Sequence, residues 1–174
     1  MTALLFVVDA VLTLVVVAFL LRVLMPLVRA DFRNPLGQAV LQFTTPVVLP
    51  LRKLLPPAGR VDVASVAALL LVQVAKTAVL RLVAGFGLAP GPLLAAAARD
   101  LASTVLQFYF FLVLAYVLLS WVAPGNPTPV ARLVGRLCEP LLAPLRRIIP
   151  PLGGLDFSAF FVLIALQALQ MLLR

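Results

Sequence analysis

Several residue types are missing or scarce in this chain of 174 residues. It has no histidine, which excludes histidine acid–base catalysis, histidine metal ligation and bis-histidine haem ligation. Its one cysteine, Cys138, excludes an intrachain disulfide and a cysteine-based metal cluster. Charged residues make up only 11%, and no nucleophile–base pair, phosphate-binding loop or metal-ligand spacing is recognisable. The sequence therefore predicts a protein that is not an enzyme and holds no cofactor or metal.

Apolar residues are abundant instead. They form 64% of the chain, whereas soluble domains contain about 45–50%. They gather in four blocks, each close to the ~20 residues that cross a bilayer. We expect four transmembrane helices, at about 3–25, 63–83, 101–121 and 155–173. No positive segment precedes the first block and no small-residue cleavage site follows it, so we expect a span rather than a signal peptide.

The net charge of +8 is unevenly distributed. The connection between the first two blocks carries five Lys or Arg and the one between the last two carries four, whereas the short 84–100 connection carries only Arg99. The positive-inside rule then predicts that both long connections are cytoplasmic and both termini lie on the other side.

Each long connection also contains a segment that is too short to span. In the second, apolar and charged residues occupy opposite helical faces, as is typical of a helix in the membrane interface. The apolar face consists of Val130, Leu133, Val134, Leu137 and Leu141, and the charged face of Arg132, Arg136 and Glu139.

The chain contains an internal repeat. TTPVVLPLRKLLPPAGRVD (44–62) aligns without gaps on CEPLLAPLRRIIPPLGGLD (138–156), and LLRVLMP (20–26) aligns on LLSWVAP (118–124). Each half, 1–86 and 87–174, thus reads as span, interfacial segment, proline-rich basic turn and span. We expect an all-α membrane protein of two helical hairpins, each with an amphipathic interfacial helix, related as a parallel repeat.

The repeated turn combines three residue types. Proline pairs end the interfacial helix, and a glycine permits backbone angles closed to other residues. Asp62 and Asp156 follow, where each could cap the next span or, in a second interpretation, form the mouth of a cation or partner site. The turn residues are Pro56, Pro57, Gly59, Pro150, Pro151 and Gly153.

With these motifs, and with ADFRNP (30–35) and PLRRIIPPLGGLDFS (144–158), the chain resembles the YggT family of small bacterial integral membrane proteins. The resemblance covers nearly the whole chain and implies a four-span inner-membrane protein. It further implies a role in osmotic tolerance and potassium uptake, in cell division or in membrane-complex assembly, since relatives are associated with each of these. The first-half turn departs from the pattern at Ala58 and Arg60.

The basic doublets beside each turn predict contact with anionic lipid headgroups, each charge contributing about 1 kcal/mol. No aromatic platform accompanies them, so nucleic acid is not an expected partner. The four residues are Arg52, Lys53, Arg146 and Arg147.

Polar residues inside apolar blocks are costly and therefore informative. Gln73 and Gln167 each lie eleven residues after an aspartate, roughly 16 Å into their spans. Matching depths predict an ion pair between Asp9 and Lys76 and a hydrogen bond between Gln107 and Gln170 at the corresponding positions. The alternative is that Asp9 and Lys76 each extend separately to the headgroups.

Together these features favour a non-enzymatic scaffold or assembly component that binds lipid and protein partners or a second copy of itself. The alternative is an ion channel or transporter component for potassium or another cation, which with four spans would need an oligomer. Transport predicts that Gln73, Gln167 and Lys76 line a wet path, whereas a scaffold predicts that they are paired and dry.

Overall fold

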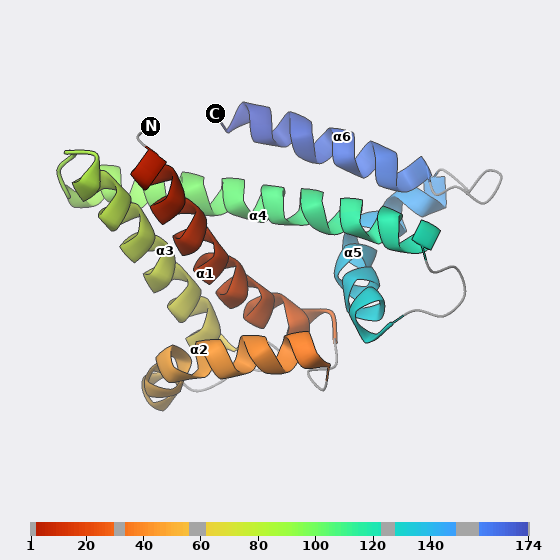
Figure 1. Ribbon diagram of the computed structural model, residues 1–174, viewed down its shortest axis with the longest axis horizontal. Helices are drawn as coiled ribbons and strands as arrows, with labels where there is room; N and C mark the ends of the chain where they lie inside the picture. The colour runs from red at the N-terminus through yellow and green to blue at the C-terminus, as the bar shows by residue number, and fades with distance from the viewer. Residues whose placement is uncertain (1–2, 30–33, 56–61, 123–127, 149–156, 174) are drawn as a thin grey trace.

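The computed structural model describes residues 3–29, 34–55, 62–122, 128–148 and 157–173. These residues form helices and contain no strand, so the all-α prediction is confirmed (Figure 1). The six helices are α1 (Ala3–Leu27), α2 (Pro35–Leu54), α3 (Val63–Val83), α4 (Pro90–Val122), α5 (Pro129–Ile148) and α6 (Phe157–Leu172).

Three helices, α1, α3 and α4, are long and apolar enough to cross a membrane. The fourth expected span corresponds to α6, which is apolar but has only 16 residues in the described part of the chain. At 1.5 Å per residue it covers about 24 Å, less than the ~30 Å hydrocarbon core. A fourth crossing therefore stays a prediction.

The helix α4 is longer than the sequence suggested. Most of the 84–100 stretch, expected to be a short connection, belongs to its first turns. Four consecutive alanines, 95–98, are strong helix formers, and proline is tolerated at the first helical positions. The connection between α3 and α4 thus shrinks to the few residues around Gly85, whose φ is +79°.

The helices form two groups of three. In the first, α1 and α3 run side by side in opposite directions and α2 lies across their lower ends (Figure 1). In the second, α6 runs back along α4, and α5 packs against both. The two groups meet along α4, which contacts α1 and α3, and both chain ends lie at the end of the molecule away from α2.

Each group has its own apolar core. Val16 and Phe19 of α1 pack with Val48 of α2 and the fully buried Ala64 and Ala68 of α3, whose small side chains let α1 and α3 approach closely. A second cluster joins α4, α5 and α6, and a third, of Met25, Leu133 and Leu137, joins the end of α1 to α5.

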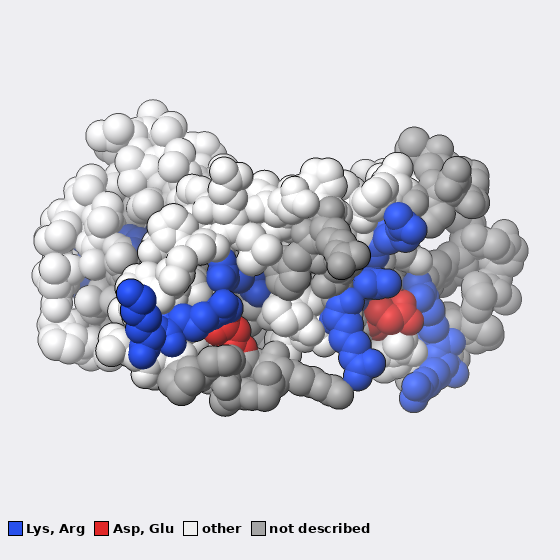
Figure 2. Space-filling model, turned by 90° about the horizontal axis from the view of Figure 1, so that it is seen from below, with Lys and Arg blue, Asp and Glu red and all other residues white. Residues whose placement is uncertain are grey.

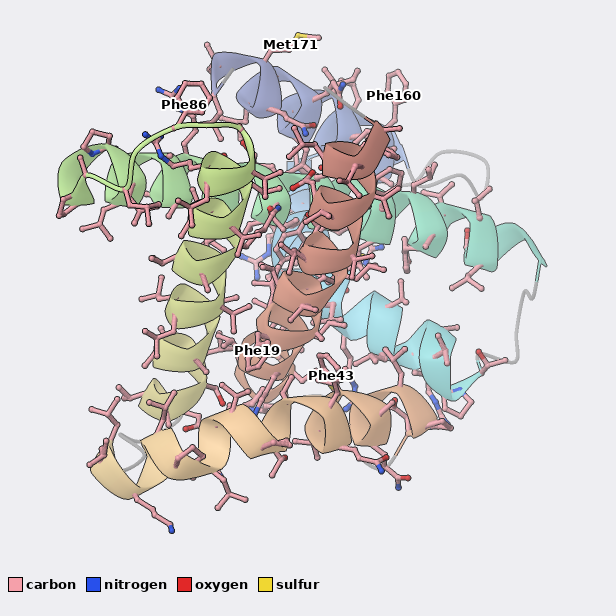
Figure 3. The ribbon with its side chains drawn as sticks, turned by 60° about the vertical axis from the view of Figure 1, so that its left-hand side comes forward. Phe19, Phe43, Phe86, Phe160 and Met171 are labelled. Atoms are coloured by element: carbon pink, nitrogen blue, oxygen red, sulfur yellow. The ribbon has the colours of Figure 1, made fainter. Side chains whose placement is uncertain are left out.

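The outer surface is strongly apolar. Figure 3 places Phe86, Phe160 and Met171 on the periphery of the molecule, and their exposed fractions are 62%, 59% and 65%. Large exposed apolar side chains of this kind recur along α1, α3, α4 and α6. Such a surface is suited to lipid rather than to water.

Candidate functional site: two buried polar networks

The first polar network surrounds Lys76, which lies on α3 and is only 6% exposed. Its Nζ lies 3.0 Å from Asp9 Oδ1 and donates a hydrogen bond of 2.7 Å to Thr13 Oγ1. Asp9 and Thr13 are four residues apart and so share one face of α1. The structure thus brings Asp9 and Lys76 together and adds Thr13, which the sequence analysis did not single out although its spacing from Asp9 was a usable signal.

Beside this pair, a second set of hydrogen bonds connects α3 to α4. Gln73, one turn before Lys76 and 1% exposed, donates from Nε2 to Thr77 Oγ1 at 3.2 Å. Thr77 in turn donates to Asp100 Oδ2 on α4 at 3.3 Å. Gln73 Oε1 is buried and has no hydrogen-bond partner among the described residues. We call Asp9, Thr13, Gln73, Lys76, Thr77 and Asp100 the lysine network.

The second half has no counterpart of this network in its described residues. Gln107 and Gln167 are exposed, Gln170 is half-buried, and no hydrogen bond joins Gln107 to Gln170. The expected pair is therefore not formed in this structure. The reason is helix rotation: Gln107 lies six residues before the buried Val113, which places it about 120° around α4 from the face that packs on α6.

The second polar network is centred on Arg22, in α1, which is 5% exposed. Its Nε donates to Ser65 Oγ of α3 at 3.1 Å, and its Nη1 donates to Thr44 Oγ1 and Thr45 Oγ1 of α2 at 2.7 and 3.0 Å. One guanidinium therefore holds three helices together at the lower end of the first group. This role was not predicted, because an arginine near the end of a span resembles the positive charges that commonly flank the cytoplasmic end of a transmembrane helix.

Asp62 completes this second network. It occupies the N-cap position of α3, as expected, but its side chain makes no capping bond to the helix backbone. Asp62 Oδ2 instead accepts hydrogen bonds from Arg52 and from Ser65 Oγ, the latter at 2.7 Å, while Oδ1 is buried without a partner among the described residues. Burial raises the pKa of Asp62, but the hydrogen bonds from Arg52 and Ser65 and the charge of Arg52 outweigh it, so the pKa lies below its ordinary value. We call Arg22, Thr44, Thr45, Arg52, Asp62 and Ser65 the arginine network.

The four basic residues expected to contact lipid divide into two kinds. Arg52 is paired with Asp62, and Arg146 bonds Glu139 Oε2 at 3.2 Å and the Tyr116 hydroxyl at 2.8 Å. Lys53 and Arg147 are exposed. Figure 2 shows the basic side chains of the lower face in two groups, one over the α2 end of the molecule and one over α5.

The remaining candidates add little chemistry. Cys138 is buried in α5, and burial raises the pKa of its thiol to about 12, so it is a poor nucleophile. The described residues contain no group of three His, Cys, Asp or Glu that could hold a metal ion. Asp156 and the turn residues Pro56, Pro57, Gly59, Pro150, Pro151 and Gly153 lie outside the described residues.

Fold and site together define a class: a small, helical, membrane-type protein with polar networks inside its apolar helices. The family model described as CCB3/YggT matches residues 1–83 and 95–174. This chain belongs to the CCB3/YggT family, and the resemblance seen in the sequence is confirmed.

Three relatives illustrate how far the similarity extends. An uncharacterized protein of Pseudomonas aeruginosa is 39% identical over 98% of this chain and 88% of its own length. The uncharacterized protein YggT of Escherichia coli K12 is 33% identical over 98% and 89%, and an uncharacterized Vibrio alginolyticus protein is 34% identical over 96% and 91%. No solved structure matches the chain.

Proposed function

We propose that this protein is a non-enzymatic scaffold or assembly and stress-tolerance component of the bacterial inner membrane. It crosses the membrane four times as two helical hairpins, with both long connections in the cytoplasm. One observation carries the proposal: Lys76, a cation inside the apolar helix α3, is buried and paired rather than open to a path. That is the dry arrangement expected of a scaffold.

The cost of placing these groups in a bilayer explains why pairing matters. A lysine or an aspartate at the centre of a span costs about 2.5–3.5 kcal/mol to insert. Pairing Asp9 with Lys76 neutralises both, and the link from Gln73 through Thr77 to Asp100 ties α3 to α4. The lysine network therefore acts as an internal clamp between α1, α3 and α4.

The hollow between α4 and α6 also favours a scaffold over a conduit. It measures about 370 Å³, and every residue that lines it is apolar. Hard cations need several oxygen ligands in place of their water, which this lining does not offer. The lining residues are Ala102, Val105, Leu106, Leu169, Leu172 and Leu173.

The helix α2 provides the proposed surface for partners. Its exposed side carries Phe43, Leu49 and Leu54, which are 56%, 52% and 79% exposed, beside Arg52 and Lys53. Apolar and basic residues on one interfacial helix suit anionic lipid together with a membrane-protein partner or a second copy of this chain. Nucleic acid is not a proposed partner.

One observation favours the alternative, an oligomeric channel or transporter component for potassium or another cation. Gln73 Oε1 is buried without a partner next to the hydroxyl of Thr77, which bonds the carboxylate of Asp100. An unpartnered oxygen among other oxygens is a feature of cation sites. The proposal and its alternative therefore differ in what Gln73 does.

The deciding experiment is potassium and sodium flux into liposomes that contain the purified protein. A scaffold predicts the same flux as empty liposomes for the wild type, for Gln73→Leu and for the double variant Asp62→Asn, Asp156→Asn. Flux through the wild type that Gln73→Leu abolishes would contradict the scaffold and establish the alternative. Leu70→Ala, on the exposed side of α3, is the matched control that should change neither result.

A further inference from the structure

A second hollow lies where the two helix groups meet at the lower face. It measures about 520 Å³ and lies between the end of α1 and one face of α5. Arg132 and Arg136 are four residues apart on α5 and therefore project from the same face, opposite Arg29 at the end of α1. The residues that line it are Val28, Arg29, Arg132, Gly135, Arg136 and Glu139.

The positive charge of this hollow is not cancelled within the described part of the chain. Glu139, its one acidic residue, is already bonded by Arg146. Arg136 donates from Nη1 to the backbone carbonyl of Arg29 at 2.9 Å, and the side chains of Arg29 and Arg132 form no hydrogen bond or ion pair with the described residues. The adjacent sequence 30–33 contains one acid and one base and so adds no net charge. All three arginines are exposed.

Apolar residues lie directly behind this charged rim. Val28, which lines the hollow, packs against the cluster of Met25, Leu133 and Leu137 that joins α1 to α5. A ligand that fits must therefore present an anion to the rim and apolar atoms beside it. The guanidinium groups of several arginines suit the oxygens of a phosphate, which they bind in a bidentate manner.

We propose that this hollow is a binding site for the phosphodiester headgroup of an anionic phospholipid. The proposal rests on the membrane placement given above, which puts the lower face at the cytoplasmic headgroups. The lipid bridges the two helix groups, because Arg29 lies in the turn directly after α1 and Arg132 and Arg136 belong to α5. This differs from the diffuse attraction expected of exposed charges elsewhere on the face.

The backbone conformation of Arg29 allows a substitution that removes its side chain without straining the chain. Its φ is +52°, in the left-handed region that glycine adopts without steric cost. Arg29→Gly therefore removes the guanidinium while the backbone carbonyl that accepts from Arg136 keeps its position. A loss of lipid binding in this variant cannot be attributed to a damaged fold if its thermal unfolding temperature is unchanged or higher.

The experiment measures lipid retention by native mass spectrometry of the full chain in detergent micelles. Phosphatidylglycerol is compared with phosphatidylcholine of the same acyl chains, and inorganic phosphate is added in a separate arm. We expect selective retention of phosphatidylglycerol, weakened about tenfold or more in the double variant Arg132→Gln, Arg136→Gln and severalfold in Arg29→Gly. The control double variant Lys53→Gln, Arg147→Gln removes the same number of positive charges, but from positions outside the hollow. It should weaken retention about threefold or less.

Two results would overturn the proposal. Equal losses in the control and in the Arg132 and Arg136 double variant would mean diffuse attraction and no site. Phosphate that displaces the lipid at equimolar concentration would mean an anion site that does not select lipid. Neither result bears on ion flux, so failure of the lipid site remains distinguishable from failure of the scaffold proposal.

Discussion

The two side chains of the Lys76–Asp9 ion pair differ in solvent exposure. The lysine side chain is 6% exposed, whereas the aspartate is 35% exposed. Exposed pairs contribute roughly 0–1 kcal/mol, but breaking a buried pair from one side leaves an uncompensated charge in a poorly polarisable interior. The main role of Asp9 is therefore to make the buried position of Lys76 tolerable, with Thr13 as the second acceptor.

A double-mutant cycle tests this pairing. We expect Asp9→Asn and Lys76→Gln each to destabilise the protein, and the double variant to be more stable than the sum of the two losses predicts. The interaction energy should be about 1–3 kcal/mol, measured by thermal or detergent-induced unfolding of the purified protein. An interaction energy near zero would show that the two side chains act separately at the headgroups.

At the scale of single residues, the level of a polar residue along its span could be predicted from the sequence, but the side of the helix on which it lies could not. A rise of 1.5 Å per residue placed Asp9 and Lys76 at matching levels, and they meet. The same reasoning placed Gln107 level with Gln170, but depth does not specify which way α4 turns its face, and Gln107 is exposed. Thr77 and Asp100 were missed because no sequence pattern distinguishes them, whereas Thr13 was missed although its spacing of four residues from Asp9 was a usable signal.

Among the helices, Arg22 explains how α2 is attached to the first group. Its hydrogen bonds reach Thr44 and Thr45 on α2 and Ser65 on α3. The aligned positions of the second half hold Ser120 in place of Arg22, and Cys138, Glu139 and Ala159 in place of its three partners. The repeat thus keeps the basic turn but not this network. The attachment of α5 rests on apolar packing and on the hydrogen bond from Arg146 to Tyr116 of α4.

Substitution of Arg22 tests this attachment. Both Arg22→Gln and Arg22→Lys should lower the free energy of unfolding by about 2–4 kcal/mol. Neither the amide of glutamine nor the single ammonium of lysine can reach acceptors spread over two helices. Thermal unfolding in detergent measures the loss. Arg147→Gln, an exposed position, is the control and should stay within about 0.5 kcal/mol of the wild type. Full stability of Arg22→Lys would contradict the account.

The Asp62–Arg52 pair predicts a pH dependence. A carboxyl whose folded pKa lies below its ordinary value, 3.8 for aspartate, stabilises the fold above that value and loses the contribution as the pH falls through the folded pKa. We therefore expect the unfolding temperature to fall as the pH is lowered below about 4. Asp62→Asn should be less stable at pH 7 and less sensitive to pH between 5 and 3. An identical acid transition in both proteins would assign the sensitivity to another group.

The positions of the helices could be predicted to different degrees. The expected span 63–83 coincides with α3, and 3–25 differs from α1 by two residues. The start of α4 was placed eleven residues too late, because hydropathy marks the apolar block while alanines continue the helix beyond it. How α2 crosses beneath α1 and α3 was not predictable, since it depends on contacts made by Arg22 rather than on periodicity.

For the whole molecule, α4 is the shared element. One side of it packs on α1 and α3 and another side on α5 and α6. Both buried polar networks lie in or against the first group, and the arginine-lined hollow lies where the end of α1 meets α5. A protein built this way couples its halves through α4 and the lower face, which fits the proposed role as a scaffold.

The membrane placement of this fold depends most on α6, because its 16 described residues are fewer than a full crossing needs. Labelling of single introduced cysteines with a membrane-impermeant maleimide tests it most directly. The buried Cys138, with its raised pKa, provides a silent background, and a Cβ at Gly87 meets no atom within 4 Å.

We expect Gly87→Cys and Leu173→Cys to be labelled from outside intact spheroplasts, and Lys53→Cys and Arg147→Cys to be labelled only after lysis. That pattern requires α3, α4 and α6 each to cross the membrane, with both long connections in the cytoplasm, and α1 is the fourth expected crossing. If Leu173→Cys is protected together with Lys53→Cys while Gly87→Cys reacts, α6 does not cross the membrane and the account of two hairpins is wrong.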